Sequence, residues 1–100
     1  MPKYTVQSIN NVSEVVITGD IYKSLSSLID FCESQINLLD LKVAIDLSHA
    51  PYIDSLTVGK LLKLRRIITQ TNRSMCLKVS DQHKSVLDAA GLSTLFGIKD

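Results

Sequence analysis

A carboxylate and a hydroxyl stand side by side at Asp54-Ser55, directly before a stretch whose apolar spacing predicts a helix over Leu56–Thr71. The first amides of a helix have no partner within it, and the helix dipole makes that end positive. Such an end favours an anion, for example the phosphate of a phosphorylated serine. Asp and Ser are also among the commonest capping residues, so these two side chains on their own are interpreted more simply as a helix cap.

The remaining reactive side chains show no pattern of a catalytic or metal-binding site. His49 and His83 are interpreted as solvated loop histidines, and Cys32 and Cys76 as small thiols that fill the core. The sequence holds no glycine-rich phosphate loop, no closely spaced metal ligands, and no Cys or Ser recognisably paired with a His and an acid. We therefore expect no enzymatic activity, no cofactor and no bound metal.

Length and composition limit the class of protein. With 100 residues, 45% of them hydrophobic, the chain is expected to form one globular domain over residues 1–100. Its 11 basic and 10 acidic residues give a formal charge of +1, without the cationic excess that nucleic-acid binding needs. No segment has the roughly 20 continuous apolar residues of a transmembrane helix, and no signal sequence is recognisable. We expect a cytoplasmic protein that neither binds nucleic acid nor inserts into a membrane.

The periodicity of the chain predicts a mixed α/β domain. Two β-branched segments, Thr5–Ile9 and Val12–Thr18, flank Asn10-Asn11, a pair that suits the positive φ angles of a tight hairpin turn. Helices and strands then alternate, which is typical of parallel strands joined by right-handed crossovers. The predicted elements are a helix over Ser24–Leu39 capped by Ser24, a central strand over Leu41–Leu47, the helix over Leu56–Thr71, a strand over Met75–Val79, and a short helix from Ser80 or Asp81 to Ala90, ended by Gly91. The expected sheet begins with an antiparallel hairpin, continues with parallel strands and carries three to four helices.

The helix over Leu56–Thr71 is predicted to be amphipathic. Its core-facing side comprises Val58, Leu61, Leu62 and Ile68, with Leu64 and Ile67 on the flank. Its other side, with Lys60, Lys63, Arg65 and Arg66, is interpreted first as a solvated face and second as a contact for an acidic partner.

Three segments together resemble a known family. They are Val-Ala-Ile-Asp-Leu-Ser at 43–48, Tyr-Ile-Asp-Ser at 52–55, and Leu-Asp-Ala-Ala-Gly-Leu at 87–92 ahead of Leu95-Phe96. This pattern, which covers about residues 19–96, is similar to the STAS domain, a family of bacterial anti-sigma factor antagonists that also includes the cytoplasmic tails of sulfate transporters. The element order predicted above is the order of that family, so the resemblance implies a STAS-like α/β fold.

The resemblance to the antagonist branch implies a phosphorylation-switched binding module. By position, the phosphorylated serine would be Ser55, with Thr57 as the second choice. The unphosphorylated protein would bind an anti-sigma factor that is itself a serine kinase of the histidine-kinase ATPase type, phosphorylation would release it, and a serine phosphatase would restore binding. The residues expected to meet the partner are Asp20, Tyr22, Tyr52, Asp54, Ser55, Leu56, Thr57, Lys60 and Asp81.

The chain departs from the family pattern at two turns. Leu56 and Thr57 stand where the family has a small residue and a glycine, and Tyr22 stands where the antagonists have an acid close to the phosphorylation site. These departures favour an alternative function, a constitutive interaction subunit of a membrane transport or signalling complex in which Asp54-Ser55 is only a helix cap. A Ser55→Asp substitution separates the two, because it should release the partner of a switched module and leave a constitutive subunit bound.

Overall fold

A β-hairpin begins the fold. In this computed structural model, which describes residues 4–49, 53–89, 91–92, 96 and 98–99, β1 (Tyr4–Ile9) pairs antiparallel with β2 (Val12–Ile17). Asn10 and Asn11 join the two strands with φ angles of 52° and 64°. Asn tolerates this left-handed conformation better than most residues, and the paired positive angles match the twist of a hairpin. The predicted hairpin is confirmed.

Three further strands extend the sheet beyond the hairpin. β3 (Lys42–Asp46), β4 (Ser74–Lys78) and the short β5 (Ile98–Lys99) follow in the order β1-β2-β3-β4-β5, and the pairs after the hairpin are parallel. β3 lies in the middle of the sheet, as its continuous apolar run predicted. The expected α/β fold with a mixed sheet is therefore confirmed.

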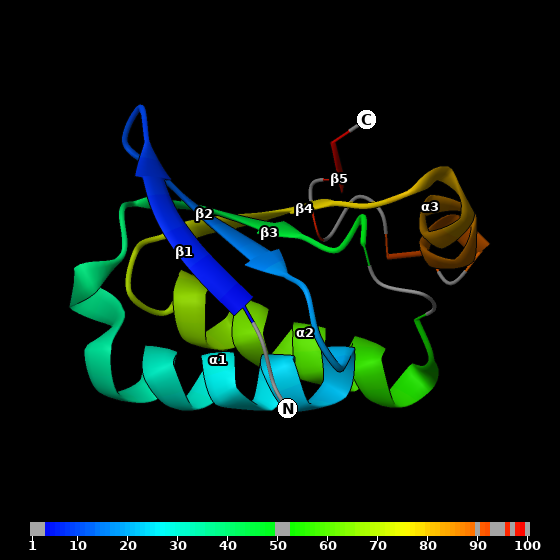
Figure 1. Cartoon of the computed structure of the whole chain (residues 1–100), viewed down its shortest axis with the longest axis horizontal. Coiled ribbons are helices and arrows are strands. Elements are labelled where there is room, and N and C mark those ends of the chain that lie inside the picture. Colours follow the sequence, from blue (N-terminus) through cyan, green and yellow to red (C-terminus); the bar gives the residue numbers. More distant parts are fainter. Residues whose placement is uncertain (1–3, 50–52, 90, 93–95, 97, 100) are drawn as a thin grey trace.

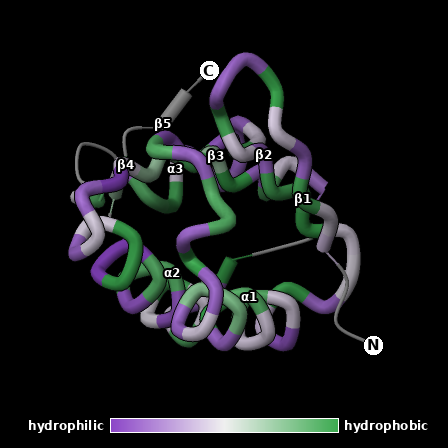
Figure 2. The backbone as a smooth tube through the Cα atoms, turned by 90° about the vertical axis from the view of Figure 1, so that its left-hand side faces the viewer, coloured by the Kyte–Doolittle hydropathy of each residue, from purple (hydrophilic) through white to green (hydrophobic). Residues whose placement is uncertain are grey.

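Two long helices cover one face of this sheet. α1 (Ile21–Gln35) connects β2 to β3 and α2 (Ser55–Thr69) connects β3 to β4, and the two helices lie side by side against the strands (Figure 1; Figure 2). A short 3-10 helix, η1 (Ile36–Leu38), follows α1, and α3 (Asp81–Ala89) lies beside the end of the sheet toward which β3 and β4 run (Figure 1). Both long helices run antiparallel to β2, β3 and β4. Their N-termini therefore lie at the edge of the fold where β2 and β3 have their carboxyl ends (Figure 1).

The core lies between the two long helices and the sheet. Alternate residues of β2, β3 and β4 are buried on the helix side, while several of their neighbours on the other side are only half-buried. This packing fixes the starts of α1 and α2 relative to the strands. The largest fully buried side chains are Val15, Ile17, Leu25, Leu28, Ile45, Leu47, Leu61, Leu64, Ile68, Leu77, Leu87 and Phe96.

The start of α1 differs from the prediction. The helix begins at Ile21, and its N-cap is Asp20, whose Oδ1 accepts a hydrogen bond from the Lys23 amide at 2.9 Å. The predicted cap, Ser24, is instead fully buried in the first turn. Both Asp and Ser are good capping residues, so local sequence does not choose between them, and the burial of Ile21 against the core decides the choice.

The core face of α2 also differs from the prediction. Its buried residues are Thr57, Leu61, Leu64 and Ile68, whereas Leu62 is 39% exposed. Leu64 therefore lies in the buried stripe and Leu62 faces away from it, the reverse of what was expected. Because leucines stand close together in this segment, local periodicity allows either Leu62 or Leu64 to face the core. Packing against α1 and the sheet selects Leu64.

The third helix is stopped by Gly91 as predicted, although its predicted last residue, Ala90, lies outside the described residues, and the helix holds an unexpected buried residue. Gly91 has a φ of 73°, and the Leu92 amide donates to the Leu87 carbonyl at 2.9 Å, as in helices that end in a left-handed glycine. His83 is not solvated as predicted, since it is 2% exposed, and its Nδ1 has no hydrogen-bond partner in the described part of the chain. It lies one turn before Leu87 on the helix face that packs inward.

Candidate functional site at the carboxyl edge of the sheet

Three acidic residues stand at the beginnings of the three main helices. Asp20 caps α1 after β2, Asp54 caps α2 after β3, and Asp81 is the first residue of α3 after β4. The carboxyl ends of parallel strands gather at one edge of a sheet, where open α/β folds place their ligand sites. Figure 1 shows the starts of α1 and α2 at this edge, on the right of the view. The structure therefore places these predicted site residues at a common edge.

Asp54 is a complete N-cap. Its backbone is extended, its Oδ1 accepts from the Thr57 amide at 2.8 Å, and its carbonyl accepts from the Val58 amide at 3.0 Å. Hydrogen bonds from the Thr57 backbone and side chain hold the pKa of the Asp54 carboxyl below its ordinary value of 3.8, because they stabilise the charged form. The capping role predicted for the Asp54-Ser55 pair thus belongs to Asp54.

The two candidate hydroxyls differ in accessibility. Ser55 is the first residue of α2 and is exposed, and Leu56 beside it is 67% exposed. Thr57, the second choice for phosphorylation and an expected partner contact, is only 1% exposed, and its side chain bonds to Asp54. Of these two hydroxyls, only that of Ser55 is open to a kinase in this conformation.

Tyr22 in the first turn of α1 contacts Lys60 in the second turn of α2. The Nζ atom of Lys60 lies 5.0 Å from the centroid of the Tyr22 ring, which is the geometry of a cation–π contact. Tyr22 remains 42% exposed. At the position where the antagonist pattern has an acid, this chain therefore presents an uncharged ring in contact with a cation.

Most of the residues predicted to meet the partner lie at the surface. Tyr52 lies outside the described residues. Thr57 faces the core, and the side chains at the surface are those of Asp20, Tyr22, Asp54, Ser55, Leu56 and Asp81, with Lys60 half-buried.

A hollow on the outer face of α2 was missed by sequence reasoning. It measures about 410 Å³ and is lined by Gly59, Leu62, Lys63 and Arg66. A side chain at Gly59 would meet only open space, because no atom lies within 4 Å of its missing Cβ. The hollow could not be predicted once Leu62 was assigned to the core, although a glycine in the middle of a basic helix was a visible sign of it.

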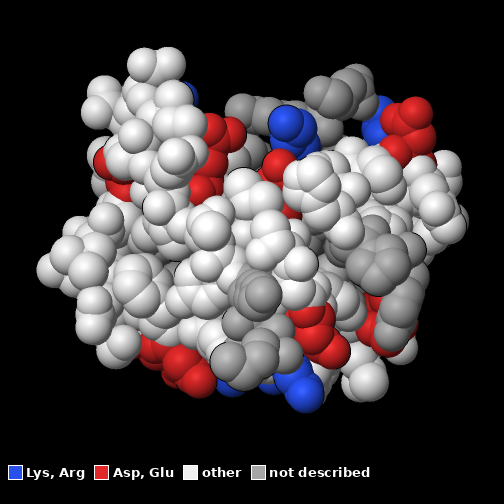
Figure 3. Space-filling model, viewed as in Figure 1, with Lys and Arg blue, Asp and Glu red and all other residues white. Residues whose placement is uncertain are grey.

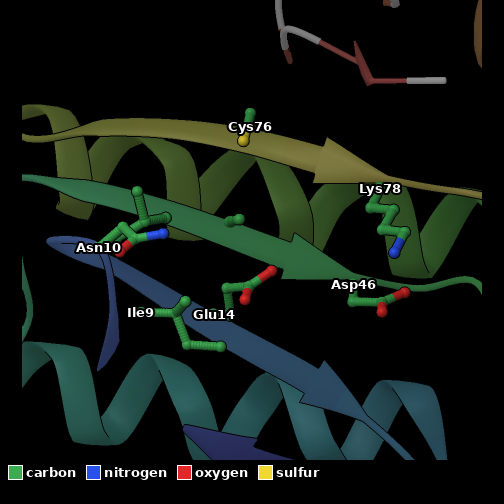
Figure 4. Close-up of a pocket in the computed structure, with 8 residues that line it drawn as sticks. Ile9, Asn10, Glu14, Asp46, Cys76 and Lys78 are labelled. Carbon is green, nitrogen blue, oxygen red and sulfur yellow. The ribbon is translucent and has the colours of Figure 1, made fainter. Parts of the chain in front are cut away.

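A second hollow lies on the face of the sheet that α1 and α2 do not cover (Figure 4). It measures about 260 Å³, and its floor includes Ala44, which sits in register between Glu14 on β2 and Cys76 on β4. Because the side chain of Ala44 is only a methyl group, it leaves a depression between the larger side chains around it. Cys76 is half-buried here, whereas Cys32 is 1% exposed, so only Cys32 fills the core as predicted.

Asp46 lies at the rim of this second hollow, and Figure 4 shows it close to Lys78 on the neighbouring strand. Its Oδ1 accepts from the Ser48 amide at 2.9 Å and from the Ser48 hydroxyl at 2.5 Å. Burial raises the pKa of Asp46, but these hydrogen bonds, with Lys78 and His49 nearby, lower that pKa by more. The carboxylate is therefore used in holding the loop after β3.

Charges on the face seen in Figure 3 are scattered among uncharged side chains and form no single patch. Among the described residues, no cluster of His, Cys, Asp or Glu is arranged to hold a metal ion, and no helix has the length and hydropathy to cross a membrane.

Solved structures share this fold at low sequence identity. A putative anti-sigma factor antagonist from Thermotoga maritima, TM1081, gives a TM-score of 0.74 at 17% identity, over 97% of this chain and 86% of that one. An anti-sigma factor antagonist from Mycobacterium paratuberculosis gives 0.75 at 16% identity, over 98% and 85%. The Bacillus cell-fate determinant SpoIIAA in its phosphorylated form gives 0.71 at 13% identity, over 98% and 90%. No curated protein matches the sequence.

The sequence pattern itself matches a family model. The model of the STAS domain covers residues 4–100, which include all three segments that carried the resemblance. Among the neighbours in structure, the protein from Mycobacterium paratuberculosis is named as an anti-sigma factor antagonist. The chain therefore belongs to the STAS domain family, and its fold is similar to that of solved anti-sigma factor antagonists.

Proposed function

We propose that this STAS domain is a phosphorylation-switched binding module of the anti-sigma factor antagonist type, with Ser55 as the switch. The unphosphorylated domain binds an anti-sigma factor that is a serine kinase of the histidine-kinase ATPase type. That kinase transfers the γ-phosphoryl group of ATP to Ser55 Oγ, leaving ADP, and the partner is released. A serine phosphatase then hydrolyses the phosphoserine and restores binding. The domain supplies the surface and the hydroxyl, and other proteins supply the catalysis.

One observation carries the proposal: Asp54, and not Ser55, caps α2. The Asp54 carboxylate already accepts from the Thr57 amide, so the helix needs no second cap. Ser55 is exposed at the first position of α2, next to the exposed apolar surface of Leu56. The structural role that would have explained Ser55 is therefore filled by its neighbour. Two relatives in structure add support, one named as an anti-sigma factor antagonist and one described in a phosphorylated form.

Phosphorylation at this place changes the surface more than the fold. A phosphate adds a charge of about −1.5 to −2, and the positive end of a helix accommodates it. The core residues of α2 face the other way and are not disturbed. A partner packed over Ser55 and Leu56 would have to desolvate the phosphate, so its affinity falls without a conformational change.

The proposal is tested by three tagged baits in lysate of the source organism: wild type, Ser55→Ala and Ser55→Asp. We expect the first two to retain an ATPase-type kinase and Ser55→Asp to lose it, with all three showing the same Tm. Retention of the kinase by all three baits would contradict the proposal.

A constitutive interaction subunit is the second candidate function. The observation that favours it is the contact between Tyr22 and Lys60, because Tyr22 stands at the position where the antagonist pattern has an acid. In that case the same baits should all retain one transporter or scaffold component to the same extent.

A further inference from the structure

One row of residues on α2 points away from the core and begins at the switch. Residues three or four apart lie above one another on a helix, so Ser55, Gly59, Leu62, Lys63 and Arg66 share one side of α2. We call this row the α2 stripe. It lies opposite the buried stripe of the same helix, and its members after Ser55 line the hollow of about 410 Å³. In Figure 2, the side of α2 that is turned from the sheet forms part of the outer surface.

The charge of this helix has one sign. The 15 residues of α2 include Lys60, Lys63, Arg65 and Arg66 but no acid, although the whole chain has 10 acidic residues. Leu62 is 39% exposed beside Lys63 and Arg66, the cations of the α2 stripe. Apolar surface flanked by cations on an exposed helix is complementary to an amphipathic segment whose polar side is acidic.

Gly59 gives an independent reason to expect that the backbone of another molecule approaches α2 closely. Glycine destabilises the middle of a helix relative to alanine, so it needs a compensating role. Nothing within the described chain supplies one, because a Cβ at Gly59 would meet no atom within 4 Å and its φ is not positive. A glycine on an exposed helix face allows another backbone to approach closely. The described residues of the chain therefore do not account for a glycine at this position.

We propose that the α2 stripe is the docking surface for an acidic amphipathic helix of the partner protein, which approaches closely at Gly59 and pairs with Lys63 and Arg66. A phosphate on Ser55 then acts by repelling that acidic helix. The role given to Ser55 rests on the proposed function, whereas the docking surface does not.

The spacing along the helix supports this mode of regulation. At 1.5 Å per residue, Ser55 is about 6 Å from Gly59 and about 16 Å from Arg66 along the axis. The Debye length at physiological salt is about 8 Å. A phosphate on Ser55 is therefore close enough to repel an acidic helix over Gly59, and too far away to neutralise Arg66. Raised salt should also weaken the docking.

The test uses the full chain, labelled with ¹⁵N, and two stapled helical peptides of about 15 residues. Both peptides carry the same leucine stripe, but the polar side of one is glutamate and that of the other is lysine. We expect the acidic peptide to shift the amide signals of Gly59, Leu62 and Arg66 and the basic peptide to leave them unchanged. Equal binding of both peptides, or shifts confined to other surfaces, would overturn the docking surface.

Substitutions on the α2 stripe sharpen the test. Gly59→Ala should raise the Tm and yet weaken binding of the acidic peptide roughly tenfold, as expected at the centre of an interface. Its matched control is Ser34→Ala on the exposed side of α1, which should leave binding unchanged. The double variant Lys63→Glu, Arg66→Glu should prefer the basic peptide, while Lys42→Glu on β3 should not. If Gly59→Ala binds as well as wild type, the close approach is overturned.

The Ser55 part of the inference has its own readout. Ser55→Asp should bind the acidic peptide more weakly than Ser55→Ala does, and equal affinities would overturn the repulsion. Failure of the docking surface is distinguishable from failure of the proposed function. If Ser55→Asp still loses the kinase in lysate but no peptide shifts the α2 signals, the docking surface alone is wrong.

Discussion

The ammonium group of Lys60 on α2 lies over the ring of Tyr22 on α1, 5.0 Å from the ring centroid. This contact joins the first turn of α1 to the second turn of α2, the helix that begins at Ser55. The antagonist pattern has an acid where Tyr22 stands. At this position the surface of the present chain therefore differs from that pattern, because it carries an uncharged ring in contact with a lysine.

Replacing Tyr22 measures what this contact contributes. Tyr22→Leu should lower the free energy of unfolding by about 0.5 to 1 kcal/mol, the usual size of an exposed cation–π contact. Tyr22→Phe keeps the ring and should unfold like wild type. Urea denaturation followed by circular dichroism gives both values. Should the Leu and Phe variants unfold alike, the ring does not stabilise the fold through Lys60.

The cap of α2 predicts a clear difference between two substitutions of Asp54. Asp54→Ala leaves the Thr57 amide without its acceptor and should lower the Tm by a few degrees. Asp54→Asn keeps a side-chain oxygen at the capping position and should stay close to wild type at neutral pH. Thermal melts of the three proteins at one pH decide the matter, and equal melting of the Ala and Asn variants would show that the cap contributes nothing.

The same carboxylate predicts a dependence on pH. The pKa of Asp54 in the folded chain lies below its ordinary value of 3.8, so folding favours the charged form. Its contribution is therefore fully present above pH 3.8 and is lost as the pH falls through the lowered pKa. Wild type should lose its advantage over Asp54→Ala in that acid range, whereas Asp54→Asn should keep its own. An advantage of wild type that persists below the lowered pKa would contradict this account.

Thr57 should act on Asp54 through its buried hydroxyl. Thr57→Val keeps the shape of the side chain and removes the hydroxyl, so the pKa of Asp54 should rise toward its ordinary value of 3.8. Thr57→Ser keeps the hydroxyl and should keep the pKa low. NMR titration of the Asp54 carboxyl carbon measures both. An unchanged pKa in Thr57→Val would mean that the backbone amide alone lowers it.

The sequence predicted those parts of the fold that depend on neighbouring residues. Asn10-Asn11 indicated the hairpin turn and Gly91 the end of α3, because each needs a left-handed backbone at that point. The errors arose where two residues were equally suitable locally. Asp20 and Ser24 are both good caps, and Leu62 and Leu64 are both plausible core residues. Burial against the sheet decides each pair, and no short window of sequence contains that information.

In the candidate site, too, features that depend on neighbouring residues were predicted, and features that depend on packing were not. Ser55 was identified from its place after Asp54 and from the family resemblance. The hollow beside it depends on Leu62 facing outward, which only the packing of α2 determines. Thr57 was expected to contact the partner and to be the second choice for phosphorylation, but its position on the helix turns it to the core.

The two cysteines should differ sharply in reactivity. Burial raises the pKa of the Cys32 thiol to about 11, and the residue is 1% exposed, so the reactive thiolate is scarce and shielded. Cys76 lies half-buried in the hollow on the open face of the sheet. An aromatic disulfide reagent at neutral pH should modify Cys76 in the folded chain and Cys32 only after unfolding in urea. Rapid modification of a folded Cys76→Ser variant would contradict the burial of Cys32.

The most direct test of the switch is the affinity of the kinase captured by the wild-type bait for the domain carrying phosphoserine at position 55, introduced during synthesis of the full chain. Isothermal titration of the purified kinase into the phosphorylated and unphosphorylated domains gives the two dissociation constants. Phosphate on Ser55 is expected to raise the Kd about tenfold or more, equivalent to about 1.4 kcal/mol per factor of ten, without lowering the Tm. Equal dissociation constants would contradict it and would leave Ser55 with no part in the control of binding.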